Sequence, residues 1–157
     1  MKIKFVSGGQ TGVDRAALDC AREADIPCGG WCPAGRMAED GVIPPTYPLQ
    51  EIPNGSYRDR TWQNVIDSDG TLIIYSGRIS GGTAETITAA HEHHKPLLLI
   101  NAADERPSNA AIQLHDFVNK QKLSCLNVAG PRASQWPEGY AFTLAILHAF
   151  YKLMSDD

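Results

Sequence analysis

The sequence predicts an α/β fold with one doubly wound, mainly parallel sheet. Two continuous apolar runs, at residues 71–75 and 96–100, are typical of parallel strands that are covered on both faces. Strand-like and helix-like segments alternate along the chain, a pattern that indicates right-handed crossover connections. Because 157 residues suffice for one sizeable core, we expect a single domain, 1–157, without a linker.

The individual elements follow from local spacing in the sequence. Residues 2–6 are a short apolar strand before a glycine turn, and small residues recur on one face of the helix expected next. The stretch 32–53 holds five prolines, which predicts a long ordered loop with an edge strand inside it. The expected strands are 2–6, 26–31, 47–52, 71–75, 96–100 and 124–129, and the expected helices are 13–24, 57–67, 83–93, 109–122 and 138–154.

The expected strand order locates a ligand site. If residues 47–52 form the third strand, the simplest order is 3-2-1-4-5-6, the Rossmann-like arrangement, which reverses between the first strand and residues 71–75. Ligands of such sheets bind at the reversal point, beyond the carboxyl ends of the strands. The loops that leave these two strands are Gly8-Gly9-Gln10-Thr11-Gly12 and Ser80-Gly81-Gly82-Thr83. We therefore expect both loops to form one anion-binding site for a phosphate-bearing ligand.

Each glycine loop leads into a predicted helix N-terminus, where unpaired backbone N–H groups and the helix dipole favour an anion. The first loop lacks the lysine of a P-loop and the spacing of the dinucleotide fingerprint, so ATP hydrolysis and hydride transfer are not expected. An alternative is that Thr11 only caps the helix together with Asp14, which requires no ligand. Capping and binding are compatible, and we count Asp14 among the expected ligand contacts.

Four further charged side chains are candidates for ligand contacts. Arg15 and Arg36 are plausible bidentate partners for phosphate, although solvated surface positions are the alternative, and Arg60 stays undecided. We expect residues 32–48 to fold over the site and to bring Arg36 to the phosphate. Glu85 follows the second glycine loop, where a carboxylate stabilises the helix dipole, orients a ligand or acts as an acid or base.

Other catalytic patterns are weak in this sequence. His91, His93 and His94 do not have the zinc-protease spacing, and histidines in a last helical turn also interact favourably with the dipole, so no metal site is expected. Cys28 and Cys32 lack a second pair of ligands. No GxSxG segment is present, which gives serine hydrolase chemistry no support.

The composition and the N-terminal sequence indicate the cellular compartment and disfavour some classes of binding partner. Eighteen acidic and fourteen basic residues give a formal net charge of −4, which argues against binding to nucleic acid through phosphate neutralisation. The N-terminus reaches glycine before it could supply a signal peptide, and no run is long enough to span a bilayer, so we expect a cytoplasmic protein without a membrane partner. The four cysteines are too few for a disulfide scaffold and are expected to be mostly buried thiols.

Several segments become recognisable together: GGQTGVDRAALD at 8–19, GWCPAGRMAEDG at 30–41, RT at 60–61, NV at 64–65, SDGTLI at 68–73 and SGGT at 80–83. In this combination the chain resembles the molybdenum cofactor carrier family. That family is similar to the Rossmann-like group of cytokinin-activating phosphoribohydrolases, often labelled lysine decarboxylases, and DNA-processing protein A. The resemblance implies a carried ligand, molybdenum cofactor (molybdopterin) or a related nucleotide-like molecule, no reaction, and a homodimer or homotetramer.

A phosphoribohydrolase-like enzyme that acts on nucleoside monophosphates is the alternative. In those enzymes the motif Pro-Gly-Gly-x-Gly-Thr-x-x-Glu supplies phosphate contacts and a catalytic glutamate. Here Ser80 replaces the proline, and Glu85 follows Thr83 by only two residues, a change of register that argues against the same hydrolysis. Glu85 is catalytic only under this alternative. A binder of single-stranded DNA is a third possibility, which the acidic balance disfavours.

Overall fold

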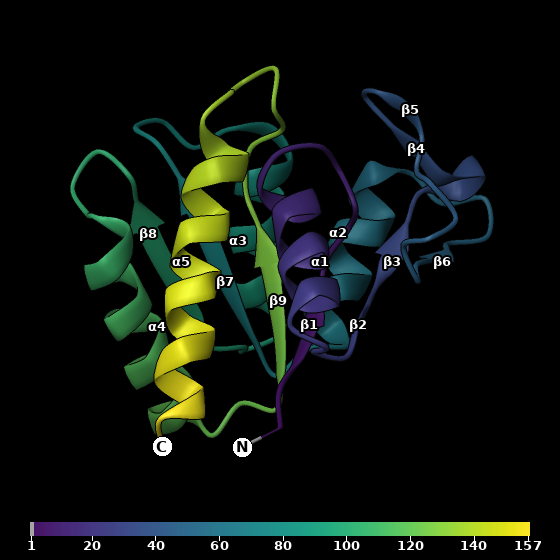
Figure 1. Ribbon diagram of the computed structural model, residues 1–157. Helices are drawn as coiled ribbons and strands as arrows, with labels where there is room; N and C mark the ends of the chain where they lie inside the picture. Colours follow the sequence, from purple (N-terminus) through teal and green to yellow (C-terminus); the bar gives the residue numbers. More distant parts are fainter. Residues whose placement is uncertain (1) are drawn as a thin grey trace.

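The computed structural model describes residues 2–157 and contains a five-stranded central sheet (Figure 1). All neighbouring strands in this sheet are parallel. In spatial order the strands are β2 (Cys28–Gly29), β1 (Lys4–Val6), β9 (Cys125–Ala129), β7 (Gly70–Tyr75) and β8 (Leu97–Asn101). The predicted α/β class with a parallel, Rossmann-like sheet is therefore confirmed.

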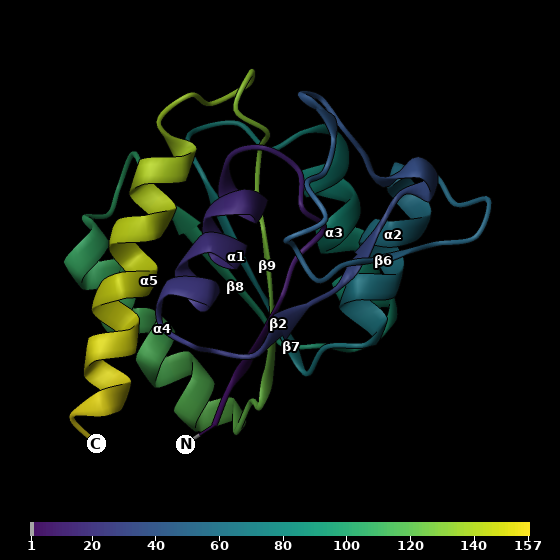
Figure 2. The ribbon, with the colours of Figure 1, turned by 45° about the vertical axis from the view of Figure 1, so that its right-hand side comes forward.

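Helices cover both faces of the sheet (Figures 1 and 2). The helices α1 (Val13–Glu23), α4 (Pro107–Gln121) and α5 (Gly139–Ser155) lie on one face, and α2 (Tyr57–Ile66) and α3 (Gly81–Glu92) lie on the other. The main core forms under the first three helices, where Phe5, Leu72, Leu126 and Ile146 are fully buried. Within residues 2–157, no helix has the length and apolar character needed to cross a membrane.

The strand order differs from the prediction in the place of the last strand. β9 lies between β1 and β7, with Lys4 opposite Cys125 and Thr71 opposite Asn127, and not at the edge after β8. Burial explains this position, because Leu126, Asn127 and Val128 are all buried, as a strand covered on both faces requires. β8 takes the edge instead and leaves Leu99 41% exposed.

The proline-rich stretch forms small elements outside the central sheet. The expected strand 26–31 breaks at Gly30, whose φ of +135° and close approach to the Ser7 backbone exclude a side chain. After this break, β3 (Trp31–Cys32) pairs in parallel with β6 (Gln50–Glu51) as a separate two-stranded sheet. The predicted edge strand at 47–52 thus exists in part, but it is not the third strand of the main sheet.

Between β3 and β6 the chain makes a short 3-10 turn, η1 (Ala34–Arg36), and a hairpin. The hairpin consists of β4 (Met37–Ala38) and β5 (Gly41–Val42), which pair antiparallel, so that residues 39 and 40 form its tip. In both ribbon views this hairpin stands at the same end of the molecule as the loop that follows β1 (Figures 1 and 2). The Glu39 N–H donates to Gln10 Oε1 at 2.9 Å, so the tip is close to the first glycine loop.

Candidate functional site

A polar cavity of about 100 Å³ opens beyond the carboxyl ends of β1, β9 and β7. Four segments that are distant in sequence line it, namely the β1–α1 loop, α2, the start of α3, and the end of β9 with the loop after it. The lining residues are Gly8, Gln10, Asp14, Arg60, Thr61, Asn64, Gly81, Gly82, Thr83, Thr86, 127–132 and Gln135. Both predicted glycine loops thus contribute to one cavity, and β9 separates the strands from which they come.

The N-terminus of α3 faces this cavity without a cap from the protein. Ser80 is the N-cap residue, and its side chain makes no capping hydrogen bond. No atom lies within 4 Å of a Cβ built on Gly81 or Gly82, so both glycines border open space. The first backbone N–H groups of a helix have no partner inside the helix and favour an anion. The start of α3 is therefore a suitable place for a phosphate group.

The first glycine loop contributes side chains more than bare backbone. Gly9 and Gly12 have positive φ angles of +77° and +85° and pack against the protein, Gly9 on Leu49 and Gly12 on the backbone of 131–133. Thr11 does not cap α1, because its hydroxyl donates to Glu39 and accepts from the Ala133 N–H at 3.1 Å. The capping alternative is therefore wrong. Gly9, Thr11 and Gly12 do not line the cavity, although they were predicted to contact the ligand.

Asp14 and Arg60 form a buried ion pair at the cavity wall. Arg60 Nη1 lies 3.5 Å from Asp14 Oδ2, and each side chain is 9% exposed. Burial raises the pKa of Asp14 to about 6, although the charge of Arg60 and the N–H groups of Gln10 and Gly130 oppose this shift. A Cβ on Gly8 would lie 1.7 Å from Arg60 Nη1, so a side chain at residue 8 would displace the guanidinium from this position. Arg60, which the sequence left undecided, is thus a site cation.

The capping of α2 determines where Arg60 lies. Ser56 precedes the helix and accepts from the Asp59 N–H at 3.3 Å, while the Asp59 carboxylate accepts from the Ser56 N–H at 2.9 Å. This reciprocal capping box fixes the first turn of α2. Arg60 then donates through Nε to the Tyr57 carbonyl at 3.3 Å and directs its guanidinium to Asp14.

Gln10 holds a hydrogen-bond donor that the protein does not satisfy. Its Oε1 accepts from the Thr11 N–H at 3.0 Å and from the Glu39 N–H at 2.9 Å, which assigns the two ends of the amide. Its Nε2 is buried and has no partner in the described chain, 2–157, and the residue is only 5% exposed. A buried donor without a partner costs about 1–3 kcal/mol. An acceptor on a bound molecule would remove this cost.

Arg132 is a second cation at the cavity that was not expected from the sequence. Its guanidinium lies 5.7 Å from the centre of the Tyr57 ring, and that of Arg60 lies at the same distance from the same ring. Arg132 follows β9 by three residues, so its position depends on the placement of β9 at the centre of the sheet. Asn127, another missed residue, lines the cavity from β9 and donates to Thr71 Oγ1 at 3.3 Å.

Three predicted charged contact residues also lie outside the cavity, and so does Ser80 of the second glycine loop. Arg15 donates to the Gly9 carbonyl at 3.0 Å and to both carboxylate oxygens of Asp40 at 3.0 and 3.2 Å. Glu85 accepts from Trp62 Nε1 at 2.8 Å and from Arg58 at 3.3 Å, and the Trp62 hydrogen bond in particular lowers its pKa. These contacts hold both side chains in structural roles outside the cavity.

Arg36 is the third of these residues, and its guanidinium serves its own loop. It donates to four backbone carbonyls at 2.8–3.0 Å, those of Ile43, Pro44, Tyr47 and Leu49. No residue of 32–48 lines the cavity. The expectation that this loop covers the site and presents Arg36 to a phosphate is therefore not met. The reason is that the loop, which is poor in regular structure, needs donors for its own carbonyls.

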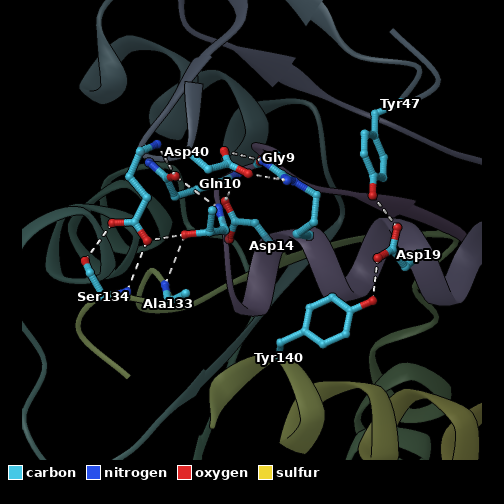
Figure 3. Close-up of polar contacts among 12 residues, drawn as sticks. Gly9, Gln10, Asp14, Asp19, Asp40, Tyr47, Ala133, Ser134 and Tyr140 are labelled. Atoms are coloured by element: carbon cyan, nitrogen blue, oxygen red, sulfur yellow. Dashed lines mark hydrogen bonds and ion pairs between the residues drawn. The ribbon is translucent and has the colours of Figure 1, made fainter. Parts of the chain in front are cut away.

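The hairpin tip is attached to the loops around the cavity by Glu39. Figure 3 shows Gln10 and Ser134, which lie on these loops. The Glu39 carboxylate accepts from the Thr11 hydroxyl, from the Ser134 hydroxyl at 2.6 Å and from the Ser134 N–H at 3.1 Å. The hydrogen bonds from Ser134 and Thr11 lower the pKa of Glu39. Together with the Arg15–Asp40 pair, this network holds the β4–β5 hairpin, the first glycine loop and the loop after β9 in one arrangement.

The four cysteines are free thiols. Cys20 and Cys32 are buried free thiols, and Cys28 and Cys125 are partly buried free thiols. Among the residues that the structure describes, no group of three or more His, Cys, Asp or Glu side chains is placed to hold a metal ion.

The fold and the cavity define an α/β protein with a polar pocket at the carboxyl ends of a parallel sheet. The model of the circularly permutated YpsA SLOG family matches residues 5–151. The chain also matches the crystal structure of a "Putative molybdenum carrier protein" from Syntrophus aciditrophicus SB, with 47% identity, a TM-score of 0.93, and coverage of 95% of this chain and 94% of that chain. No curated protein matches this chain.

This chain therefore belongs to the circularly permutated YpsA SLOG family. The resemblance to molybdenum carrier proteins, which the motifs between residues 8 and 83 indicated, is confirmed.

Proposed function

We propose that this protein binds a phosphorylated small molecule in the cavity at the start of α3 and carries it without transforming it. The observation that carries this proposal is the uncapped N-terminus of α3, where Gly81 and Gly82 border open space inside a cavity that also contains Arg60 and Arg132. Backbone N–H groups and two guanidinium groups are the usual partners of phosphate oxygens.

The carried molecule that we propose is molybdenum cofactor, in which a pterin bears a phosphate, or a related nucleotide-like ligand. The support for this identity is the solved structure of the related carrier protein, which is 47% identical. Cytoplasmic location and assembly into a homodimer or homotetramer belong to the same proposal. The phosphoribohydrolase alternative has no support, because Glu85 is bound by Trp62 and Arg58 outside the cavity.

Native mass spectrometry of freshly purified protein tests the proposal. We expect a mass larger than that of the chain, and we expect the released molecule to show phosphate and the absorbance and fluorescence of an oxidised pterin. Protein that carries nothing after expression in cells that make the cofactor, and that binds no phosphorylated pterin or nucleotide in calorimetry, would contradict the proposal.

A further inference from the structure

The two glycine loops follow strands that are not neighbours. β9 lies between β1 and β7 and pairs with both, so the strands that lead into the two loops are separated by two strand spacings, or about 10 Å. Both loops line one cavity. A ligand that reaches from the start of α3 to the β1–α1 loop therefore contacts different groups at its two ends.

The end of the cavity at α3 suits the charged part of such a ligand. Its wall consists of the uncapped helix N-terminus with Gly81 and Gly82. The opposite end, at the β1–α1 loop, presents Gln10 and Asp14. There the unsatisfied Nε2 of Gln10 is a neutral donor, and the Asp14 carboxylate is an acceptor when it is ionised.

Gln10 and Asp14 are neighbours at the cavity wall. Asp14 Oδ2 lies 3.4 Å from the backbone nitrogen of Gln10 and 3.5 Å from Arg60 Nη1, and the side chains of Gln10 and Asp14 are both buried. The two hydrogen bonds to Gln10 Oε1 prevent the amide from turning over, so its N–H groups stay available to the cavity. A fixed donor beside a fixed acceptor is complementary to a ring edge that carries an acceptor beside a donor.

We propose that Gln10 and Asp14 select the ring of the ligand, and that this ring carries a carbonyl beside an N–H group, as guanine does. Gln10 Nε2 donates to the carbonyl, and the Asp14 carboxylate accepts from the N–H. The phosphate of the same molecule lies at the start of α3. This inference rests on the proposed function, because it assigns the uncharged part of the ligand that the cavity is proposed to bind.

Guanosine and adenosine 5′-monophosphates test the assignment, because they match in size and phosphate but present opposite patterns on this ring edge. Guanine offers a carbonyl beside an N–H, whereas adenine offers an amino group beside a ring nitrogen acceptor. Calorimetric titration at pH 8, where a carboxyl group with a pKa of about 6 is ionised, is expected to give GMP at least a tenfold lower Kd than AMP.

A pair of variants assigns this preference to Gln10. Gln10→Glu keeps an oxygen for the Thr11 and Glu39 N–H groups and removes the donor, so the ratio of the two affinities should fall to about one. Gln135→Glu places the same charge on the cavity wall, in the loop after β9, and should weaken both nucleotides while the ratio stays. Thermal unfolding of each variant checks that the fold is kept.

The outcomes separate this inference from the proposed function. Equal affinities of the wild-type protein for GMP and AMP, or a preference that survives in Gln10→Glu, would overturn the assignment of the ring while phosphate binding stands. Failure of both nucleotides and of inorganic phosphate to bind would contradict the proposed function itself.

Discussion

Replacement of Gly82 by alanine should stabilise the protein and weaken its ligand binding at the same time. Gly82 is the second residue of α3, its φ angle lies outside the left-handed region, and no atom lies within 4 Å of the added Cβ. Nothing in the protein therefore opposes the methyl group. Alanine in place of a helical glycine contributes about 0.5–1 kcal/mol, which should raise Tm by about 1–4 °C in a chain of this size.

Binding should change in the opposite direction. The methyl group occupies the space through which a phosphate approaches the N–H groups of α3, and a hydrogen bond to a charged group contributes about 1.5–3 kcal/mol. The affinity for a nucleoside monophosphate should therefore fall about ten- to a hundredfold. Calorimetric titration and thermal unfolding of the same samples measure both effects.

Thr88→Ala is the matched control for Gly82→Ala. Thr88 lies on the exposed side of the same helix and outside the cavity, so alanine improves helix propensity there without contact to a ligand. Its affinity should equal that of the wild type. A Gly82→Ala protein that is stabilised and binds as tightly as the wild type would refute the placement of the phosphate at α3.

Three further predictions follow from the site. The pKa of Asp14 is raised from 3.8 to about 6 in the folded protein, so this residue should cost about 2 kcal/mol of stability as pH rises from 4 to 7. Urea unfolding of wild type against Asp14→Asn should show that pH-dependent difference, and parallel profiles would contradict it. Arg36→Met should lower the free energy of unfolding by about 2 kcal/mol or more, since it removes four hydrogen bonds to carbonyls. It should change the ligand affinity measured by calorimetry less than twofold. A large loss of affinity without loss of stability would show that Arg36 contacts the ligand. Glu85→Gln should bind nucleoside monophosphates as tightly as the wild type does, because Glu85 is bound by Trp62 and Arg58. Neither protein should release free base in a chromatographic assay. Base release that depends on Glu85 would favour the phosphoribohydrolase alternative.

The elements of this fold were predictable because their signals are local. The apolar runs at 71–75 and 96–100 and the helical spacing after residue 57 depend only on neighbouring residues, and the corresponding strands and helix are present. The strand order cannot be predicted from neighbouring residues, because it depends on which strand is stabilised most by burial under helices on both faces of the sheet. The segment at 124–129 is short and contains Asn127, so its sequence did not mark it as a central strand.

The candidate site was predictable as a location more than as a set of contacts. The sequence indicates which loops leave the carboxyl ends of strands, and the cavity lies there. It does not indicate where a long side chain points, since an arginine reaches several ångströms in any direction from its backbone. Arg36 therefore seemed suited to phosphate but binds the carbonyls of its own loop, while Arg60 and Arg132 reach the cavity from elements whose packing only the structure shows.

A crystal structure of this protein with a phosphorylated ligand, either the molecule that copurifies with it or a soaked nucleoside monophosphate, tests phosphate binding most directly. We expect phosphate density at the start of α3, within hydrogen-bond distance of the N–H groups of Gly82 or Thr83 and beside Arg60 or Arg132. Ordered ligand found only elsewhere, with the start of α3 filled by solvent, would contradict it.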